Sequence, residues 1–264
     1  MTSLPEFSNP PVTEVALGVQ FRPVPQLRAI ELATLREQWR AELPVAQEQP
    51  PLPPISEGQA VGTPPVLFRV GPPLLSRLWF LSEDGSRLVQ IQLDRLIVNW
   101  RQADGDGVYP RYPAIRAMFA DRASDLAGFI AERGFDALEI TQVEVNYINS
   151  IPLSEDRLGH LEDLLRGLSL NADHHLAPPE QARVAMVFPV PDLGRPPVRL
   201  YVEAAPASRP DGQSAVHFSL SVRGAPSGGK IDDALEFMDG AHDHIVRSFD
   251  KMTVETMHTV WGKQ

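Results

Sequence analysis

Alternating apolar and polar side chains in residues 78–101 constrain the fold more than any other feature of the chain. The Asp84-Gly85 pair separates two such runs and favours a tight turn, because these residues tolerate positive φ angles. The residues after the turn alternate between two faces: Val89, Ile91 and Leu93 on one, and Gln90, Gln92 and Asp94 on the other. The pattern predicts a β-hairpin or three-strand meander with one buried face and one polar face.

The alternation changes phase at Asp94-Arg95, which predicts a turn or a bulge at this point. Beyond it, one face carries Leu96, Val98 and Trp100, and the other carries Ile97, Asn99 and Arg101. The meander therefore continues into a further strand that returns beside the preceding one.

Strand and helix periodicities along the rest of the chain predict its other secondary-structure elements. Further strands are expected at 12–21, 66–70, 138–151, 183–190, 198–204 and 215–223, and helices at 25–43, 113–133, 154–168 and 230–251. In the first helix, Leu27, Ile30, Leu35 and Trp39 would face the core. Thr253 would cap a short terminal helix. The proline-rich residues 44–65 and residues 169–180 are predicted to be loops, because proline lacks the N–H that helices and ladders use.

The two halves of the chain show the same order of elements. Residues 12–133 and 138–252 each run strand, helix, several strands and long helix. With an offset of 128, Thr13 aligns with Thr141 and Val15 with Val143. These matches favour an internal duplication of a β-α-β-β-β-α unit, with two similar halves of independent descent as the alternative.

The predicted fold class is therefore α+β, with antiparallel strands and helices packed on one face. The two units would be residues 1–136 and 137–264, fused into one globular domain. The TATA-binding-protein-like saddle has a comparable duplicated arrangement, and this analogy concerns the fold alone.

The amino-acid composition restricts the cellular compartment that we expect for this protein. The chain of 264 residues has a formal net charge of −10 and no cysteine. Disulfides, thiolate metal sites and cysteine nucleophiles are thereby excluded, as in proteins of the reducing cytoplasm. The N-terminus lacks a basic and an apolar region, so we expect no signal peptide. No apolar run approaches the ~20 residues of a membrane span. We expect a cytoplasmic protein that does not contact membranes.

Several motifs together resemble a known family. They are NPPVTEV (9–15), LVQIQLDRLIVNWR (88–101), YPRYPAI (109–115), QVEVNYINSI (142–151) and HTVWGK (258–263). The chain resembles, over nearly its full length, a sporadically distributed, uncharacterised family of bacterial proteins. The resemblance implies a bacterial origin and a self-contained unit. It transfers no functional residue to this chain.

The polar face of the predicted sheet is the first candidate site, for a protein partner or a small ligand. Its residues would be Gln90, Gln92, Asp94, Glu144, Asn146, Arg199, Tyr201, Glu203, His217, Ser219, Ser221 and Arg223. A second group combines arginines with aromatic side chains, which is the composition of an interface hot spot or of a packed corner. Its members are Asn99, Trp100, Arg101 and Arg111, with Tyr109 and Tyr112 nearby. The alternative for the whole face is an ordinary solvated sheet surface.

Enzyme and nucleic-acid functions are weaker alternatives. Asp94, Glu144 and Glu203 with His217 could supply acid–base groups or metal ligands if they converged. No nucleotide, hydrolase or zinc motif is present, and His242 and His244 lie about 200° apart on one helix, which excludes joint chelation. We expect no cofactor and no metal. Nucleic-acid binding is least favoured, because the chain is acidic.

Overall fold

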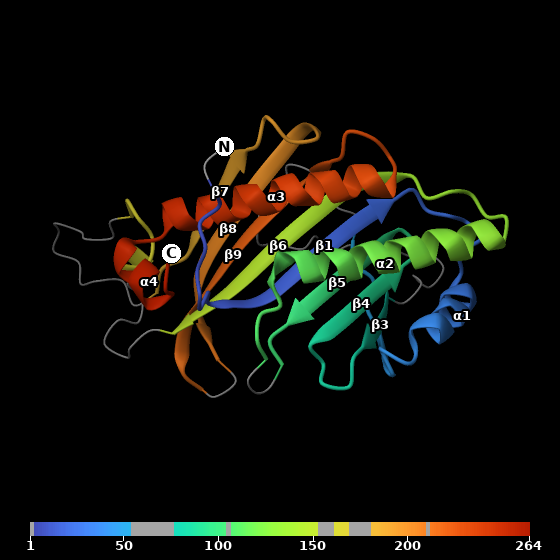
Figure 1. Cartoon of the computed structure of the whole chain (residues 1–264), viewed down its shortest axis with the longest axis horizontal. Helices are drawn as coiled ribbons and strands as arrows, with labels where there is room; N and C mark the ends of the chain where they lie inside the picture. The colour runs from blue at the N-terminus through green and yellow to red at the C-terminus, as the bar shows by residue number, and fades with distance from the viewer. Residues whose placement is uncertain (1–2, 54–76, 104–106, 153–160, 169–180, 210–211) are drawn as a thin grey trace.

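The described residues form one antiparallel sheet of nine strands. The computed structural model describes residues 3–53, 77–103, 107–152, 161–168, 181–209 and 212–264. The strand order is β2-β3-β4-β5-β1-β6-β9-β8-β7 (Figure 1). The strands are β1 (Val12–Phe21), β2 (Val45–Gln49), β3 (Arg77–Leu81), β4 (Arg87–Gln92), β5 (Arg95–Arg101), β6 (Ile140–Pro152), β7 (Val184–Pro189), β8 (Arg195–Ser208) and β9 (Ser214–Ala225). The expected α+β class with an antiparallel sheet is confirmed.

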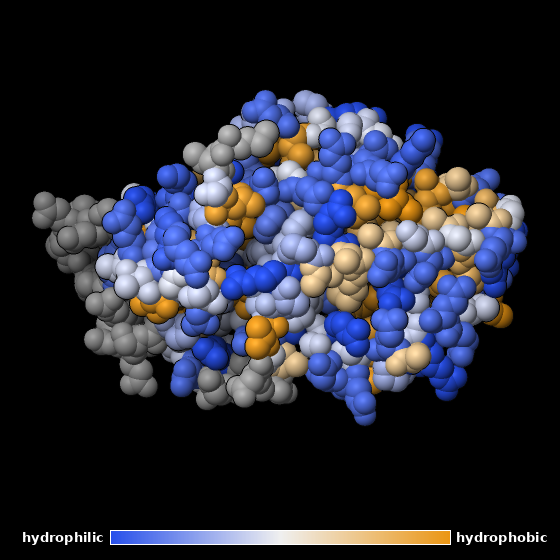
Figure 2. All heavy atoms as spheres, in the orientation of Figure 1, coloured by the Kyte–Doolittle hydropathy of each residue, from blue (hydrophilic) through white to orange (hydrophobic). Residues whose placement is uncertain are grey.

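Two long helices cover one face of this sheet. The helix α2 (Arg111–Glu132) packs on β5 and β1, and α3 (Ile231–Met252) packs on β6 and β9 (Figure 1). Figure 2 shows hydrophobic side chains gathered along the line between these helices, within an otherwise mostly hydrophilic surface. Burial of their apolar stripes against the sheet supplies the main favourable term for folding. We call the opposite side of the sheet, which α2 and α3 leave uncovered, the open face.

The centre of the sheet joins the two halves of the chain. β1 pairs antiparallel with β6, and Leu17 lies opposite Val145 near the middle of both strands. β5 lies on the outer side of β1, and β9 on the outer side of β6. Leu17 and Val145 are fully buried, so one continuous core lies beneath both long helices.

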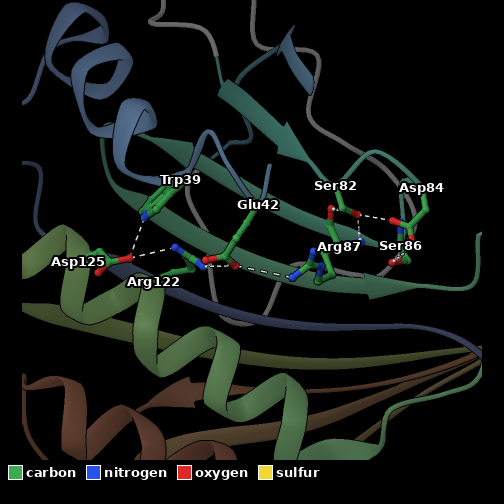
Figure 3. Close-up of polar contacts among 8 residues, drawn as sticks. All are labelled: Trp39, Glu42, Ser82, Asp84, Ser86, Arg87, Arg122 and Asp125. Carbon is green, nitrogen blue, oxygen red and sulfur yellow. Dashed lines mark hydrogen bonds and ion pairs between the residues drawn. The ribbon is translucent and has the colours of Figure 1, made fainter. Parts of the chain in front are cut away.

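The predicted meander is present as β3, β4 and β5, with tight turns on both sides of β4. Gly85 has a φ of 71°, which is the left-handed conformation that the turn requires. The carboxylate of Asp84 accepts hydrogen bonds from the hydroxyl groups of Ser82 and Ser86 (Figure 3). The bond from Ser82, together with those from Ser86, lowers the pKa of Asp84 to about 2.

A polar cluster attaches α1 (Ala29–Trp39) to α2. The indole N–H of Trp39 donates to Asp125 Oδ2 at 2.7 Å, and Arg122 donates to the same oxygen at 3.1 Å (Figure 3). Arg122 also pairs with Glu42 at 2.7 Å, while its guanidinium lies 5.6 Å from the Trp39 ring centroid. The buried Arg122 side chain thus has charged partners, which its burial requires.

Four sequence expectations need correction. The predicted loop 44–65 contains the edge strand β2. Ile30, expected to face the core, is 72% exposed on the outer side of α1. Within the expected helix 154–168, the described part is a short 3-10 helix, Leu161–Asp163, followed by turns. Thr253 does not cap α4 (Glu255–Val260) with its side chain; its hydroxyl donates to Phe249 O at the end of α3. The expected strand 66–70 and loop 169–180 lie outside the described residues.

Within the described residues, no helix is both long and apolar enough to cross a membrane.

Candidate functional site

The open face brings together most of the residues that the sequence nominated. β6 and β9 place Glu144 opposite Arg223 and Asn146 opposite Ser221, and β8 adds Tyr201 opposite Ser221. Arg223 donates to Glu144 Oε1 at 3.1 Å, and its guanidinium lies 5.1 Å from the centroid of the Tyr201 ring. These contacts make an ordered polar surface across three strands.

A second polar row crosses the first half of the same face. The Gln90 amide donates to Asn99 Oδ1 at 2.8 Å, and the Asn99 amide donates to Glu14 Oε1 at 2.5 Å. Gln90 Oε1 in turn accepts hydrogen bonds from Arg77 and Trp79. Burial raises the pKa of Glu14, although the bond from Asn99 opposes this shift.

Part of the open face is covered by the chain itself. The amide of Gln92 exchanges hydrogen bonds with the backbone of Leu52, at 3.0 and 3.1 Å. Arg95 donates to Pro53 O at 2.9 Å and to Gln20 Oε1 at 2.8 Å. Gln92 and Arg95 are consequently buried, and their groups serve to hold residues 52–53 against β4 and β5.

The middle of the open face carries acceptors that nothing in the described chain satisfies. Gln142 Oε1 and Asn146 Oδ1 on β6 are buried and make no hydrogen bond within the described residues. Asn146 lies opposite Ala16 on β1 and Ser221 on β9, and Gln142 lies opposite Gln20 on β1. The two acceptors thus lie on the same face of the central strand β6.

The nominated residues divide between two sides of the sheet. Those on the open face are Gln92, Asn99, Arg101, Glu144, Asn146, Arg199, Tyr201, His217 and Arg223. Asp94 lies in the β4–β5 turn and accepts a hydrogen bond from Gln92. Trp100 packs in the core beside Tyr109, and Arg111 lies at the start of α2. Trp100 and Arg111 therefore do not share a surface with Arg101.

The four groups considered for acid–base chemistry do not all converge: of the four, only His217 and Glu203 are neighbours on the open face, where the Glu203 charge acts on His217. Glu144 pairs with Arg223, whereas Glu203 pairs with Arg183. Arg223 and Ser219, which face these two glutamates on β9, are four residues apart, or about 13 Å. His217 faces Ser150 of β6, and burial lowers its pKa. Among the described residues, no cluster of three groups could hold a metal ion.

A cavity on the helix side of the sheet was not predicted. Its volume is about 400 Å³, and five separate parts of the chain line it. They are the N-terminal segment (Leu4, Pro5, Glu6, Phe7, Pro10 and Val12), the start of α2 (Tyr109, Arg111, Tyr112 and Pro113), the strands β6 and β9 (Tyr147, Asn149 and Leu220) and α3 (His242, Ile245, Val246 and Phe249). We call it the N-terminal cavity.

One end of the N-terminal cavity carries a chain of polar groups. Tyr147 and His242 Nδ1 are 2.7 Å apart, and the hydroxyls of Tyr109 and Tyr147 are 3.5 Å apart. Burial lowers the pKa of His242 to about 4 and raises the pKa of Tyr147. Near neutral pH both rings are therefore uncharged, and the Tyr147 hydroxyl and His242 Nδ1 share a hydrogen bond.

Sequence signals for this cavity were weak. The alternation of β6 placed Tyr147 on the core face, and the motif at 109–113 drew attention to Tyr109 and Tyr112. His242 was considered only as a metal ligand. No local pattern linked it to Tyr147, which is 95 residues away in the chain.

Comparison of the chain with protein-family models finds no match, and the search of curated proteins finds none. The resemblance to the bacterial family stays a prediction, and the function is argued below from geometry.

Proposed function

We propose that this protein is a non-enzymatic interaction module that binds a protein partner on its open face. The observation that carries the proposal is the pair of buried, unsatisfied acceptors, Gln142 Oε1 and Asn146 Oδ1, at the centre of that face. An unpaired buried acceptor costs free energy, on the order of 1–3 kcal/mol. A partner that donates hydrogen bonds to these two oxygens would remove this cost.

The charge of the open face favours an acidic partner. The described part of the face carries more arginines than carboxylates, although the whole chain has a net charge of −10. The arginines are Arg77, Arg95, Arg101, Arg183, Arg199 and Arg223, and the carboxylates are Glu14, Asp94, Glu144 and Glu203. Complementary charge increases the association rate and helps to select partners.

The aromatic residues argue against nucleic acid as the partner. Single-stranded nucleic acid binds to a sheet by stacking bases on open aromatic faces. Tyr201 is buried under Arg223, and Trp79 has the guanidinium groups of Arg77 and Arg101 near its ring. The rings that could stack a base are thus already occupied by arginine.

The proposal includes an internal duplication. The strand order places β5-β1 and β6-β9 symmetrically about the centre of the sheet. The Leu17–Val145 pair is separated by 128 residues, because 145 − 17 = 128, and this is the offset at which the sequences of β1 and β6 align. A twofold axis through this pair, perpendicular to the sheet, would relate the halves and give a saddle of the TATA-binding-protein type.

Partner capture tests the proposal. The full-length protein, Asn146→Arg, Arg223→Ala and the control Arg28→Ala are immobilised and exposed to lysate of the native host, and retained proteins are identified by mass spectrometry. Asn146→Arg places a long charged side chain at the centre of the open face, whereas Arg28 is an exposed arginine before α1. We expect a partner that wild type and Arg28→Ala retain and that both open-face variants lose.

Retention of the same proteins by all four forms would contradict the proposal. Elution from a heparin column at a salt concentration that depends on Arg223 would instead support a nucleic-acid partner. Melting temperatures of the variants close to that of wild type establish that the loss is not due to unfolding.

A further inference from the structure

The N-terminal cavity is too large to be a packing defect. Protein interiors are close-packed, and a single water molecule occupies about 30 Å³ of liquid volume. The cavity has about 400 Å³, which falls in the range of small-molecule sites. Most of its wall is apolar, and the side chains of Phe7, Leu220 and Ile245 contribute to it while belonging to the hydrophobic core.

The polar end of the cavity has spare hydrogen-bonding capacity. The hydrogen bond with His242 Nδ1 uses only part of the donor and acceptor capacity of the Tyr147 hydroxyl, so this hydroxyl can also bond to a ligand. The Tyr109 hydroxyl is 3.5 Å from that oxygen, at the outer limit of a hydrogen bond. Its proton can therefore turn to a ligand oxygen with little loss.

A second layer of contacts fixes this polar end. The Tyr112 ring stacks on the His242 ring, with centroids 4.0 Å apart and planes inclined by 3°. The Tyr112 hydroxyl donates to Asp239 Oδ1 at 2.7 Å, and Arg116 binds both oxygens of Asp239 at 2.6 and 2.9 Å. The imidazole of His242 is thus held in place before any ligand arrives.

The N-terminal segment that closes the cavity is also tied down. Arg111 donates to the carbonyl oxygens of Phe7 and Ser8, and it does so from a left-handed backbone with φ of 70°. Such a conformation is unfavourable for a non-glycine residue, so the surrounding contacts must hold it. The backbone N–H of Ser8 also donates to Gly262 O at 3.0 Å. The cavity is therefore preformed, which lowers the entropy cost of binding.

We propose that the N-terminal cavity binds a small, uncharged, largely apolar molecule that carries one hydroxyl or carbonyl oxygen, hydrogen-bonded to Tyr109 and Tyr147. The apolar wall accounts for most of the ligand surface, and the two phenols select the oxygen. A charged ligand is disfavoured, because its ion would be buried beside neutral rings, and Arg111 already binds two carbonyls. This site is independent of the open face, since the sheet separates them.

Three related probes test the ligand class. The full-length protein is titrated with 2-naphthol, naphthalene and 2-naphthoate, and binding is followed by probe fluorescence. We expect 2-naphthol to bind with a micromolar to submillimolar Kd, naphthalene about fivefold more weakly, and 2-naphthoate at least tenfold more weakly. Absence of 2-naphthol binding below 1 mM, or tighter binding of 2-naphthoate, would overturn the proposal.

Matched variants locate the bound probe. Tyr147→Phe keeps the ring and removes the hydroxyl, so the preference for 2-naphthol over naphthalene should disappear while naphthalene binding persists. Val246→Trp fills the cavity and should abolish binding of both. Val260→Trp adds the same indole at a position on α4 that is 66% exposed, and it should bind like wild type.

Leu4→Trp narrows the cavity from the N-terminal segment and replaces Val246→Trp if that variant does not fold. Unchanged 2-naphthol binding in a folded cavity-filling variant would show that the probe lies elsewhere and would refute the site.

Discussion

At the residue scale, His242 and Glu14 show how burial disfavours the charged form of a base and of an acid. Burial lowers the pKa of His242 to about 4 and raises the pKa of Glu14, because desolvation penalises the charged form of each. Both residues are nevertheless hydrogen-bonded, His242 to Tyr147 and Glu14 to Asn99. Each group thus keeps a hydrogen-bond partner while burial disfavours its charged form.

His242 predicts a specific dependence of stability on pH. Its pKa is near 6.5 in the unfolded chain and about 4 in the folded protein, so the unfolded state binds more protons between these values. The free energy of unfolding should therefore fall as pH decreases from about 6.5 to about 4, by up to about 3 kcal/mol from this group. Urea denaturation at several pH values measures this change.

The His242→Gln variant should lose that part of the pH dependence, whereas His244→Gln, two positions along the same helix, should retain it. An equal slope in wild type and His242→Gln would show that His242 is not buried in its neutral form.

At the element scale, α2 and α3 occupy equivalent places on the sheet but differ in how tightly they fit it. Gly128 is exposed on α2, and a Cβ there would meet no atom within 4 Å. Gly240 lies on α3, where a Cβ would come within 2.7 Å of Leu193 Cδ1. The helix α3 is thus bounded on one side by the β7–β8 connection that carries Leu193.

This difference predicts unequal effects of the same substitution. Gly128→Ala should raise the free energy of unfolding by about 0.5–1 kcal/mol, because alanine restricts the unfolded chain and favours helix. Gly240→Ala gains the same helix propensity but must displace Leu193, so its net gain should be smaller or absent. Denaturant titration of both variants measures the difference. Equal stabilisation would mean that Leu193 moves away without cost.

At the scale of the whole molecule, the β1–β6 pairing joins the two halves into one sheet over one core. Calorimetry of the full chain should therefore show a single transition, with equal calorimetric and van't Hoff enthalpies. Residues 1–136 and 137–264 share the buried Leu17–Val145 pair, and neither half can unfold without exposing it. Two separate transitions would show that the halves are independent domains.

The sequence by itself determined the local elements and their faces. The alternation around Gln90 and the Asp84-Gly85 turn specified the meander and its polar side, because side-chain direction in a strand depends only on residue parity. The face of Asn99, Glu144 and Arg223 follows from the same rule. The edge strand β2 was missed, because most of its residues are exposed and show no alternation.

Tertiary structure decided which of these faces and ends meet. The N-terminal cavity needs the phenols of Tyr109 and Tyr147, the ring of His242 and the segment around Phe7, which lie far apart in the chain. These groups lie together only because α2 and α3 pack on the sheet and because the N-terminal segment contacts the C-terminal end at Gly262. A periodic pattern records whether a side chain faces the core, whereas the partner it meets there is set by long-range packing that no local spacing encodes.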